Sequence, residues 1–291
     1  MFESLNSIVE QCENSGGTKD FADVVIENEM RSSGTDCECV KEKMRAMWKA
    51  MLEAAHSYED NLLSRSGLTG GDGGRFKKYA SSQKTICGPF ILNVITNALK
   101  MAESNACMKR IVASPTAGSC GVLPAVLVPL FEENKFEEDK IVKSLFVSAG
   151  IGQVIANRAS ISGAEGGCQA EIGSASAMAA GTLVYLYGGS ARQIASAAGF
   201  SLQNLLGLVC DPVAGLVEIP CVKRNVVGAV NACSCADMAL AGIEPRIPAD
   251  EVIDAMRAVG IKMDSSLKET GLGGLAATSS AKKVGSSLAV S

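Results

Sequence analysis

The chain has 291 residues, of which 47% are apolar and 20% are charged, and its net charge is −4. That size allows one large domain or two small ones with a substantial core. Lysine and arginine are scattered, with no basic stripe and no interleaved aromatic residues, so the chain lacks the features of a nucleic-acid-binding protein. Only 4% of the residues are aromatic and glycine numbers 30, so we expect an interior of small side chains.

The start of the chain and its cysteine content predict a cellular location. The sequence Met1-Phe2-Glu3 has no basic flank and no apolar segment after it, so we expect no secretory signal. Without such a signal, 11 cysteines indicate a reducing cytoplasm rather than a disulfide framework. The uncharged residues 172–191 approach the length of a membrane span but are rich in glycine and serine. We therefore predict a buried helix and no membrane contact.

Helical patterns follow one another along the chain. A short apolar pattern after residue 18 indicates one helix, and a longer helix is expected from Thr35, paired with Glu38 as a capping box, to about residue 58. Residues 67–74 are mostly glycine and are expected to form a loop. Further helices are predicted over residues 89–107, 119–132, 137–158, 168–187, 191–206, 223–241 and 248–262.

Alternating strand patterns are nearly absent, so we predict an all-α fold, a compact multi-helix domain whose loops carry the chemically important residues. The helices differ in character along the chain. Residues 1–62 are expected to form an N-terminal amphipathic portion. Residues 63–291 are expected to form a more apolar helical core joined to it, most simply as one continuous structural unit.

Three cysteines stand beside chain-breaking residues and are the main chemical signal. Cys168 follows Gly-Gly, Cys210 precedes Asp-Pro, and Cys221 follows Ile-Pro. Glycine and proline hold the backbone outside regular helix, so these thiols can point at a shared group. Cys168 also stands where a helix is expected to begin, and the helix dipole there favours a thiolate. Three soft ligands from separate loops suit an iron–sulfur cluster with one iron open to substrate.

The residues by themselves also allow a plainer interpretation. Free cysteine is a common buried small hydrophobic residue, and the separations of these three match neither zinc fingers nor ferredoxins. We interpret six further cysteines as core or incidental residues: Cys12, Cys87, Cys107, Cys120, Cys233 and Cys235.

Longer motifs decide between these interpretations. Residues 160–173 read SISGAEGGCQAEIG and residues 210–225 read CDPVAGLVEIPCVKRN, with supporting motifs at 66–72, 114–119 and 269–276. Over nearly the whole chain the sequence resembles the iron–sulfur-dependent L-serine dehydratases, and more narrowly the α subunit of the two-subunit type. The resemblance implies that Cys168, Cys210 and Cys221 hold a [4Fe–4S] cluster whose fourth iron binds L-serine. It also implies a lyase that forms pyruvate and ammonia together with a separate β subunit.

The chain departs from this family at its end. Some members finish in a cysteine that caps the open iron, whereas this sequence finishes Leu288-Ala289-Val290-Ser291. We therefore expect no capping by its own tail. The β region, which is fused in some relatives, is not in this sequence, so the part of the active site that it supplies is not in this sequence either.

The serine carboxylate needs hydrogen-bond donors, and two loops are candidates. Backbone amides at a turn that leads into a helix bind anions well, although a plain helix-capping turn explains each loop equally. Loss of the α-proton needs a base, and the sequence identifies none: His56 has the pattern of a surface residue, and Lys223, Arg224 and residues 268–270 are equally open. The candidate substrate contacts are Ser66, Thr69, Gly70, Gly71, Ser114, Thr116, Ala117, Gly118, Ser119 and Asn157, with Ser160 and Ser162 as possible partners of the cluster.

Other functions compete with this hypothesis. Pyridoxal phosphate catalyses the same reaction on other folds, but it needs a Schiff-base lysine and usually a framework with strands, so we expect no pyridoxal phosphate here. A non-catalytic iron–sulfur sensor or electron-transfer protein is the alternative, and it leaves the substrate-loop motifs unexplained. Threonine or cysteine in place of serine stays open, because the size of the pocket decides it.

Overall fold

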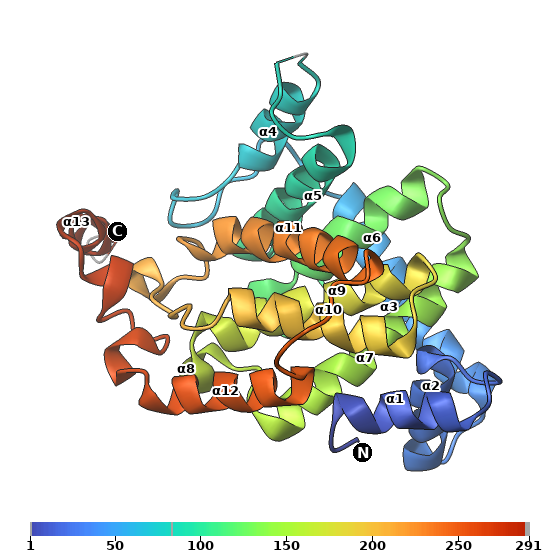
Figure 1. Cartoon of the computed structure of the whole chain (residues 1–291). Coiled ribbons are helices and arrows are strands. Elements are labelled where there is room, and N and C mark those ends of the chain that lie inside the picture. The colour runs from blue at the N-terminus through green and yellow to red at the C-terminus, as the bar shows by residue number, and fades with distance from the viewer. Residues whose placement is uncertain (1, 83, 289–291) are drawn as a thin grey trace.

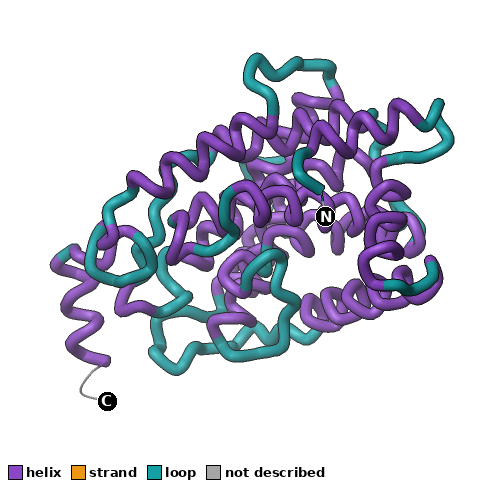
Figure 2. Tube along the Cα trace, turned by 90° about the horizontal axis from the view of Figure 1, so that it is seen from below, coloured by secondary structure: helices purple, strands orange, loops and turns teal. Residues whose placement is uncertain are grey.

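The computed structural model describes residues 2–82 and 84–288, and every regular element within them is a helix (Figures 1 and 2). The predicted all-α fold is confirmed, and the β contact found in these residues is an isolated bridge between Cys210 and Lys268. The α-helices are α1 (Leu5–Asn14), α2 (Phe21–Ser33), α3 (Cys37–His56), α4 (Asp72–Ala80), α5 (Pro89–Ala106), α6 (Val122–Glu132), α7 (Glu138–Arg158), α8 (Gly163–Gly166), α9 (Ser174–Leu186), α10 (Ala191–Asn204), α11 (Cys221–Leu240), α12 (Ala249–Lys262) and α13 (Ser279–Leu288).

Helix α9 lies at the centre, and α6, α7, α10 and α11 pack around it (Figure 1). All of its side chains except that of Tyr185 are buried, as expected for a helix that is apolar on every side. Ser176 of this helix finds partners inside the core: its Oγ donates to the Gly228 carbonyl at 2.6 Å and accepts from Ser201 Oγ at 2.7 Å. No described helix is long and apolar enough to cross a membrane, which agrees with the prediction of a buried helix here.

Two predicted local features are wrong. The capping residue of α3 is Asp36, whose Oδ1 accepts from the Cys39 amide at 2.8 Å, and not Thr35 with Glu38. A carboxylate one residue closer to the helix competes successfully with the threonine hydroxyl. The glycine-rich loop is also shorter than predicted, because Asp72 already begins α4. Gly73 and Gly74 form its first turn and pack against Tyr58 and Asp60, where larger side chains do not fit.

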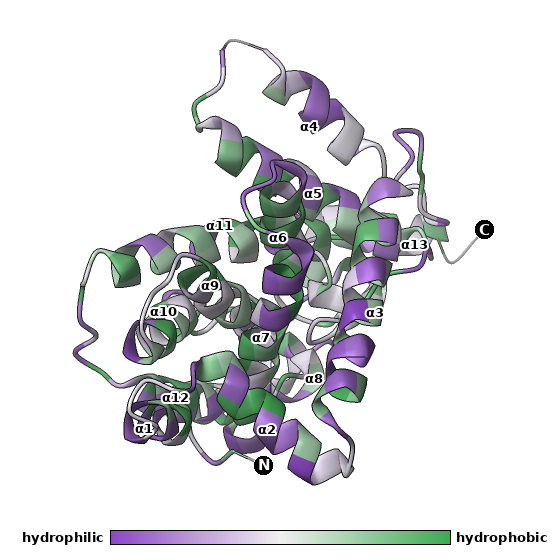
Figure 3. Cartoon of the chain, turned by 90° about the vertical axis from the view of Figure 1, so that its right-hand side faces the viewer, coloured by the Kyte–Doolittle hydropathy of each residue, from purple (hydrophilic) through white to green (hydrophobic). Residues whose placement is uncertain are grey.

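The N-terminal helices share the hydrophobic core with the rest of the chain. Leu5, Phe21 and Trp48, from α1, α2 and α3, are almost fully buried and belong to the same continuous cluster as the side chains of α9. The polar faces of these helices point outward (Figure 3). The division at residue 62 stays a prediction. The chain end that bears on self-capping, residues 289–291, lies outside the described residues.

Close helix crossings around α9 depend on glycine, and replacing one should destabilise the fold. A Cβ on Gly181 would overlap Ile151 Cδ1 and lie 3.2 Å from Ile194 Cγ2. We expect Gly181→Val to lower the free energy of unfolding by about 1–3 kcal/mol, the usual range for overpacking. Gly88→Ser is the control, because nothing lies within 4 Å of a Cβ there and serine caps helices well. Equal urea midpoints for both variants would contradict the prediction.

Candidate functional site

The three predicted cysteines come from three separate segments. Cys168 lies between α8 and a π-helical segment, Gln169–Gly173, that leads into α9. Cys210 lies in an extended segment bridged to Lys268, and Cys221 is the first residue of α11. The loop before α11 lies on the same side of the molecule as α8 (left in Figure 1).

The structure brings the three thiols together in a buried place. Cys168 and Cys210 are 3% and 4% exposed, and Cys221 is half-buried. Burial raises the pKa of each thiol to about 12. A neighbouring thiol contributes to this rise in pKa in each case: Cys221 for Cys168, Cys168 for Cys210, and Cys210 for Cys221. The guanidinium of Arg224 acts in the opposite sense on all three, so the thiols form one group beside one cation.

Arg224 also fixes the loop that carries the second cysteine. Its Nη2 lies 2.8 Å from Asp211 Oδ1, with the two side chains only 13% and 4% exposed. Its Nη1 donates to the Val209 carbonyl at 2.7 Å. The other oxygen of Asp211 accepts from the Leu275 amide at 2.7 Å. Each buried charge is thus paired and hydrogen-bonded, which is the condition for placing it away from water.

A late segment of the chain closes over Cys210. The Cys210 amide donates to the Leu267 carbonyl and its carbonyl accepts from the Glu269 amide, both at 2.8 Å. The carboxylate of Glu269 is one of the charges that raise the pKa of the Cys210 thiol, after burial and the charges of Cys168 and Glu171. The motif at 269–276 is therefore part of this site.

Glu171 links the cysteines to the loop at 114–119. Burial raises the pKa of its carboxyl group, and a hydrogen bond from the Thr116 side chain acts against this. A Cβ on Gly163 would lie 2.8 Å from Glu171 Oε2 and 3.1 Å from Cys210 Sγ, and a Cβ on Gly118 would lie 3.4 Å from Glu171 Oε1. Glycine at both positions keeps the space beside this carboxylate and thiol free of side chains.

The loop at 114–119 is held against the start of α11. Thr116 and Ser119 form a capping box around the short 3₁₀ helix Ala117–Ser119. Asn225, which is 1% exposed, donates to the carbonyl oxygens of Gly118 at 2.8 Å and Cys221 at 3.0 Å. One amide side chain thus ties this predicted substrate loop to a predicted cluster ligand.

The glycine-rich loop is held by a second buried carboxylate. Glu218, which is 6% exposed, accepts from Ser64 Oγ at 2.7 Å and from Ser66 Oγ at 2.7 and 2.9 Å. Thr69 is also buried, and its hydroxyl has no hydrogen-bond partner among the described residues. A Cβ on Gly70 would overlap a backbone carbonyl, so only glycine fits there. Because Glu218 lies between Cys210 and Cys221 in sequence, it joins this loop to the cysteine loop.

A third carboxylate fixes the far end of the same loop. Gly71 precedes α4 with a φ of +74°, where glycine is favoured. Glu103 is fully buried and accepts from the amides of Asp72 at 2.9 Å and Gly73 at 3.0 Å. It also accepts from Tyr58 Oη at 2.5 Å. A negative charge at these free amides stabilises the start of the helix.

Other candidate residues have different partners. The Asn157 side chain donates to the Phe2 carbonyl at 3.1 Å and so holds the N-terminal segment. Its contact with substrate stays a prediction. His56 is exposed and lies 2.8 Å from Glu132, which agrees with the surface position expected for it. Lys223 pairs with the first residue of α4 at 2.6 Å.

No role was assigned from the sequence to three carboxylates that organise these loops, of which Glu103 and Glu218 are buried and Glu171 is partly buried. Glu171 and Glu218 lie inside the motifs around the cysteines, and a charged residue within an otherwise apolar, glycine-rich motif is the signal that would have marked them. Glu103 lies on the apolar face of α5, and its sequence context gives no comparable signal beyond a charge at a core position.

The donor set fits an iron–sulfur cluster. Three thiols come from separate segments, a cation lies beside them, and a glycine leaves room next to Cys210. Clusters take one thiolate per iron, so their ligands stand farther apart than those of a single ion. Within residues 2–82 and 84–288, no three His, Cys, Asp or Glu side chains are arranged to hold a single metal ion.

Comparison with known proteins identifies the family. The family model of the serine dehydratase alpha chain matches residues 18–276. The chain therefore belongs to the serine dehydratase alpha chain family. It is 48% identical over 264 residues to the probable L-serine dehydratase, alpha chain, of Bacillus subtilis, covering 91% of this chain and 88% of that protein.

Two further relatives differ in length. The L-serine dehydratase, alpha chain, of Peptoniphilus asaccharolyticus is 44% identical over 289 residues, covering 98% of this chain and 97% of that protein. The L-serine dehydratase of Helicobacter pylori strain J99 is 38% identical over 291 residues, covering 95% of this chain but only 62% of that protein. That longer relative contains a region with no counterpart here.

Proposed function

We propose that this chain is the α subunit of an L-serine ammonia-lyase that converts L-serine into pyruvate and ammonia. The observation that carries the proposal is the buried group of Cys168, Cys210 and Cys221 in a member of the serine dehydratase alpha chain family. The two loops expected to contact substrate are tied to the same segments by Glu171, Glu218 and Asn225, as expected for one active site.

In this proposal the three cysteines hold a [4Fe–4S] cluster. When bound, the cluster supplies a Lewis-acidic iron that makes the β-hydroxyl of serine a better leaving group. The first contribution of the chain's own residues is to balance the charge of the ligands. Three thiolates bring three negative charges into a buried place, and Arg224, fixed by Asp211, is the cation that offsets part of them.

The loops position the amino acid. The backbone amides of Ala117 and Gly118 and the hydroxyl of Thr69 are the donors we assign to the serine carboxylate. Thr69 suits this role because its buried hydroxyl has no partner among the described residues. The Ser66 hydroxyl donates a hydrogen bond to Glu218. This bond fixes the loop before serine binds. We assign no residue of this chain as the base that removes the α-proton.

We further propose that a β subunit completes the enzyme in the cytoplasm. This sequence spans 62% of the longer relative from Helicobacter pylori, which is a single chain. In this proposal a separate protein supplies the region of that relative which this sequence does not span. The relatives from Bacillus subtilis and Peptoniphilus asaccharolyticus are named as alpha chains, which supports the same division.

The test is anaerobic reconstitution of the purified chain with iron and sulfide, followed by a pyruvate assay with L-serine. We expect little or no turnover by the chain alone and a large increase on adding a β partner of the family type. Full turnover by the single chain would remove the need for the partner. Turnover by partner-complemented protein free of iron would overturn the proposed chemistry. An iron-loaded complex that never forms pyruvate would favour the sensor or electron-transfer alternative.

A further inference from the structure

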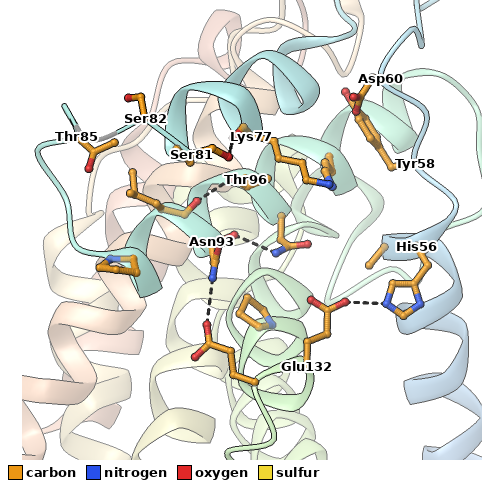
Figure 4. Close-up of a pocket in the computed structure, with 18 residues that line it drawn as sticks. His56, Tyr58, Asp60, Lys77, Ser81, Ser82, Thr85, Asn93, Thr96 and Glu132 are labelled. Atoms are coloured by element: carbon orange, nitrogen blue, oxygen red, sulfur yellow. Dashed lines mark hydrogen bonds and ion pairs between the residues drawn. The ribbon is translucent and has the colours of Figure 1, made fainter.

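A cavity of about 670 Å³ lies apart from the cysteine site, between the end of α3, α4, α5 and the end of α6 (Figure 4). None of the three cysteines lines it, and neither does any residue of the two predicted substrate loops. Its volume is in the range of small-molecule sites, which is roughly 300–1,000 Å³. Its walls are mainly polar, so the ligand has to be polar as well.

One wall carries two lysines without carboxylate partners. Lys100 of α5 and Lys77 of α4 both line the cavity. Burial lowers the pKa of Lys100, the charge of Lys77 lowers it further, and the charges of Asp60 and Glu132 act against this. Neither ammonium lies within ion-pair distance of a carboxylate in the described part of the chain, and Lys100 Nζ lies over the Tyr58 ring, 5.5 Å from its centroid. Lys100 is half-buried, and an ammonium group in such a place lacks acceptors for its hydrogen atoms, whereas Lys77 is exposed.

The wall below them carries carboxylates. Glu132, at the end of α6, lies 2.8 Å from His56 Nε2, and the next residue, Glu133, accepts from Asn93 Nδ2 at 3.1 Å (Figure 4). With Asp60 near the lysines, the cavity holds three carboxylates in all. A multiply charged anion such as phosphate would be repelled by them, whereas a ligand with one charge of each sign would find a partner at each end.

Uncharged polar side chains line the cavity between these two walls. Asn93 and Asn97 lie on one face of α5, and Ser81, Ser82 and Thr85 follow α4 at the rim (Figure 4). They offer hydrogen bonds to a polar side chain of the ligand. We propose that this cavity is a second binding site, for a free α-amino acid with a polar side chain. Its carboxylate pairs with Lys100 and Lys77, and its ammonium group faces Glu132.

The test uses isothermal titration calorimetry on the full chain with L-asparagine, which has no β-hydroxyl to eliminate. We expect saturable binding, at least about tenfold weaker in Lys100→Met and in Glu132→Gln, because each removes one of the two charge pairs. Lys77→Met is the second lysine variant if Lys100→Met fails to fold, as judged by circular dichroism. Lys78→Met is the matched control, since that lysine is exposed on α4 and does not line the cavity. It should bind like the unchanged chain.

Ligand analogues and loop variants separate this site from others. Succinamate has the same length as asparagine but no ammonium group, so it should bind at least about tenfold more weakly, and inorganic phosphate should not compete. Equal binding of succinamate, tight binding of phosphate, or no saturable binding of L-asparagine would overturn the proposal. The proposal would also be overturned if L-asparagine binding survived in Lys100→Met but was lost in Thr116→Ala, because the ligand would then bind at the cysteine site. No outcome depends on serine turnover, so this proposal and the proposed function fail independently.

Discussion

Replacing Cys168, Cys210 or Cys221 with serine is expected to abolish both the iron–sulfur cluster and the conversion of serine to pyruvate. Each thiol comes from a different segment, so no neighbouring cysteine can take its place. A serine hydroxyl is a hard, weakly acidic donor and a poor ligand for cluster iron. Iron and sulfide content, visible absorbance and pyruvate formation, measured anaerobically with the β partner present, check all three variants.

The matched controls are Cys12→Ser and Cys107→Ser. Cys12 is buried in α1 among residues of the core, and Cys107 is half-buried at the end of α5. Both variants should keep an iron content and a turnover close to those of the unchanged protein. Loss of iron from either control, or normal iron in any one of the three site variants, would show that the ligand assignment is wrong.

Glu218→Ala is expected to lower kcat/KM for serine about 10- to 100-fold while leaving the cluster in place. The carboxylate of Glu218 is the acceptor for the hydroxyl groups of Ser64 and Ser66. Its removal leaves buried hydroxyls unsatisfied, which costs about 1–3 kcal/mol, and a loop displaced by about 1 Å costs about 100-fold in rate. Steady-state kinetics of the complemented enzyme, with iron content measured in parallel, gives the result.

Two further variants separate this effect from a general loss of stability. Glu218→Gln keeps one carbonyl oxygen as an acceptor and should retain more activity than Glu218→Ala. Glu244→Ala removes an exposed carboxylate between α11 and α12 and should leave kcat and KM unchanged. If Glu218→Ala loses iron in proportion to activity, Glu218 supports the cysteine loop and not the substrate loop.

Much of the helical fold could be predicted because its signals are local. The uncharged pattern of residues 172–191 correctly indicates a buried helix, which the structure places at Ser174–Leu186. Helix α4 was missed because its first turn contains two glycines, which intrinsically disfavour a helix. Contacts with Tyr58 and Asp60, and the hydrogen bonds of Glu103 to its first amides, outweigh this preference. These contacts are distant in sequence, so the local pattern does not contain them.

The site was predictable only in part, for a related reason. The backbone breaks beside Cys168, Cys210 and Cys221 mark them as unusual, but local sequence gives no distance between them. Their assignment rested on the resemblance to a family. The carboxylates of Glu171 and Glu218 act by accepting hydrogen bonds from neighbouring loops, and such a role becomes visible only when the loops are placed.

The pairing of Cys210 with Leu267 and Glu269 has a consequence for how the protein matures. During synthesis the segment around residue 269 leaves the ribosome after almost every helix of the bundle has already emerged. Until then Cys210 lacks the hydrogen bonds and the shielding from water that residues 267–269 provide. Any inorganic group that these three thiols carry is therefore loaded after Cys221 has emerged, either before residues 267–269 pair with Cys210 or when that pairing reopens.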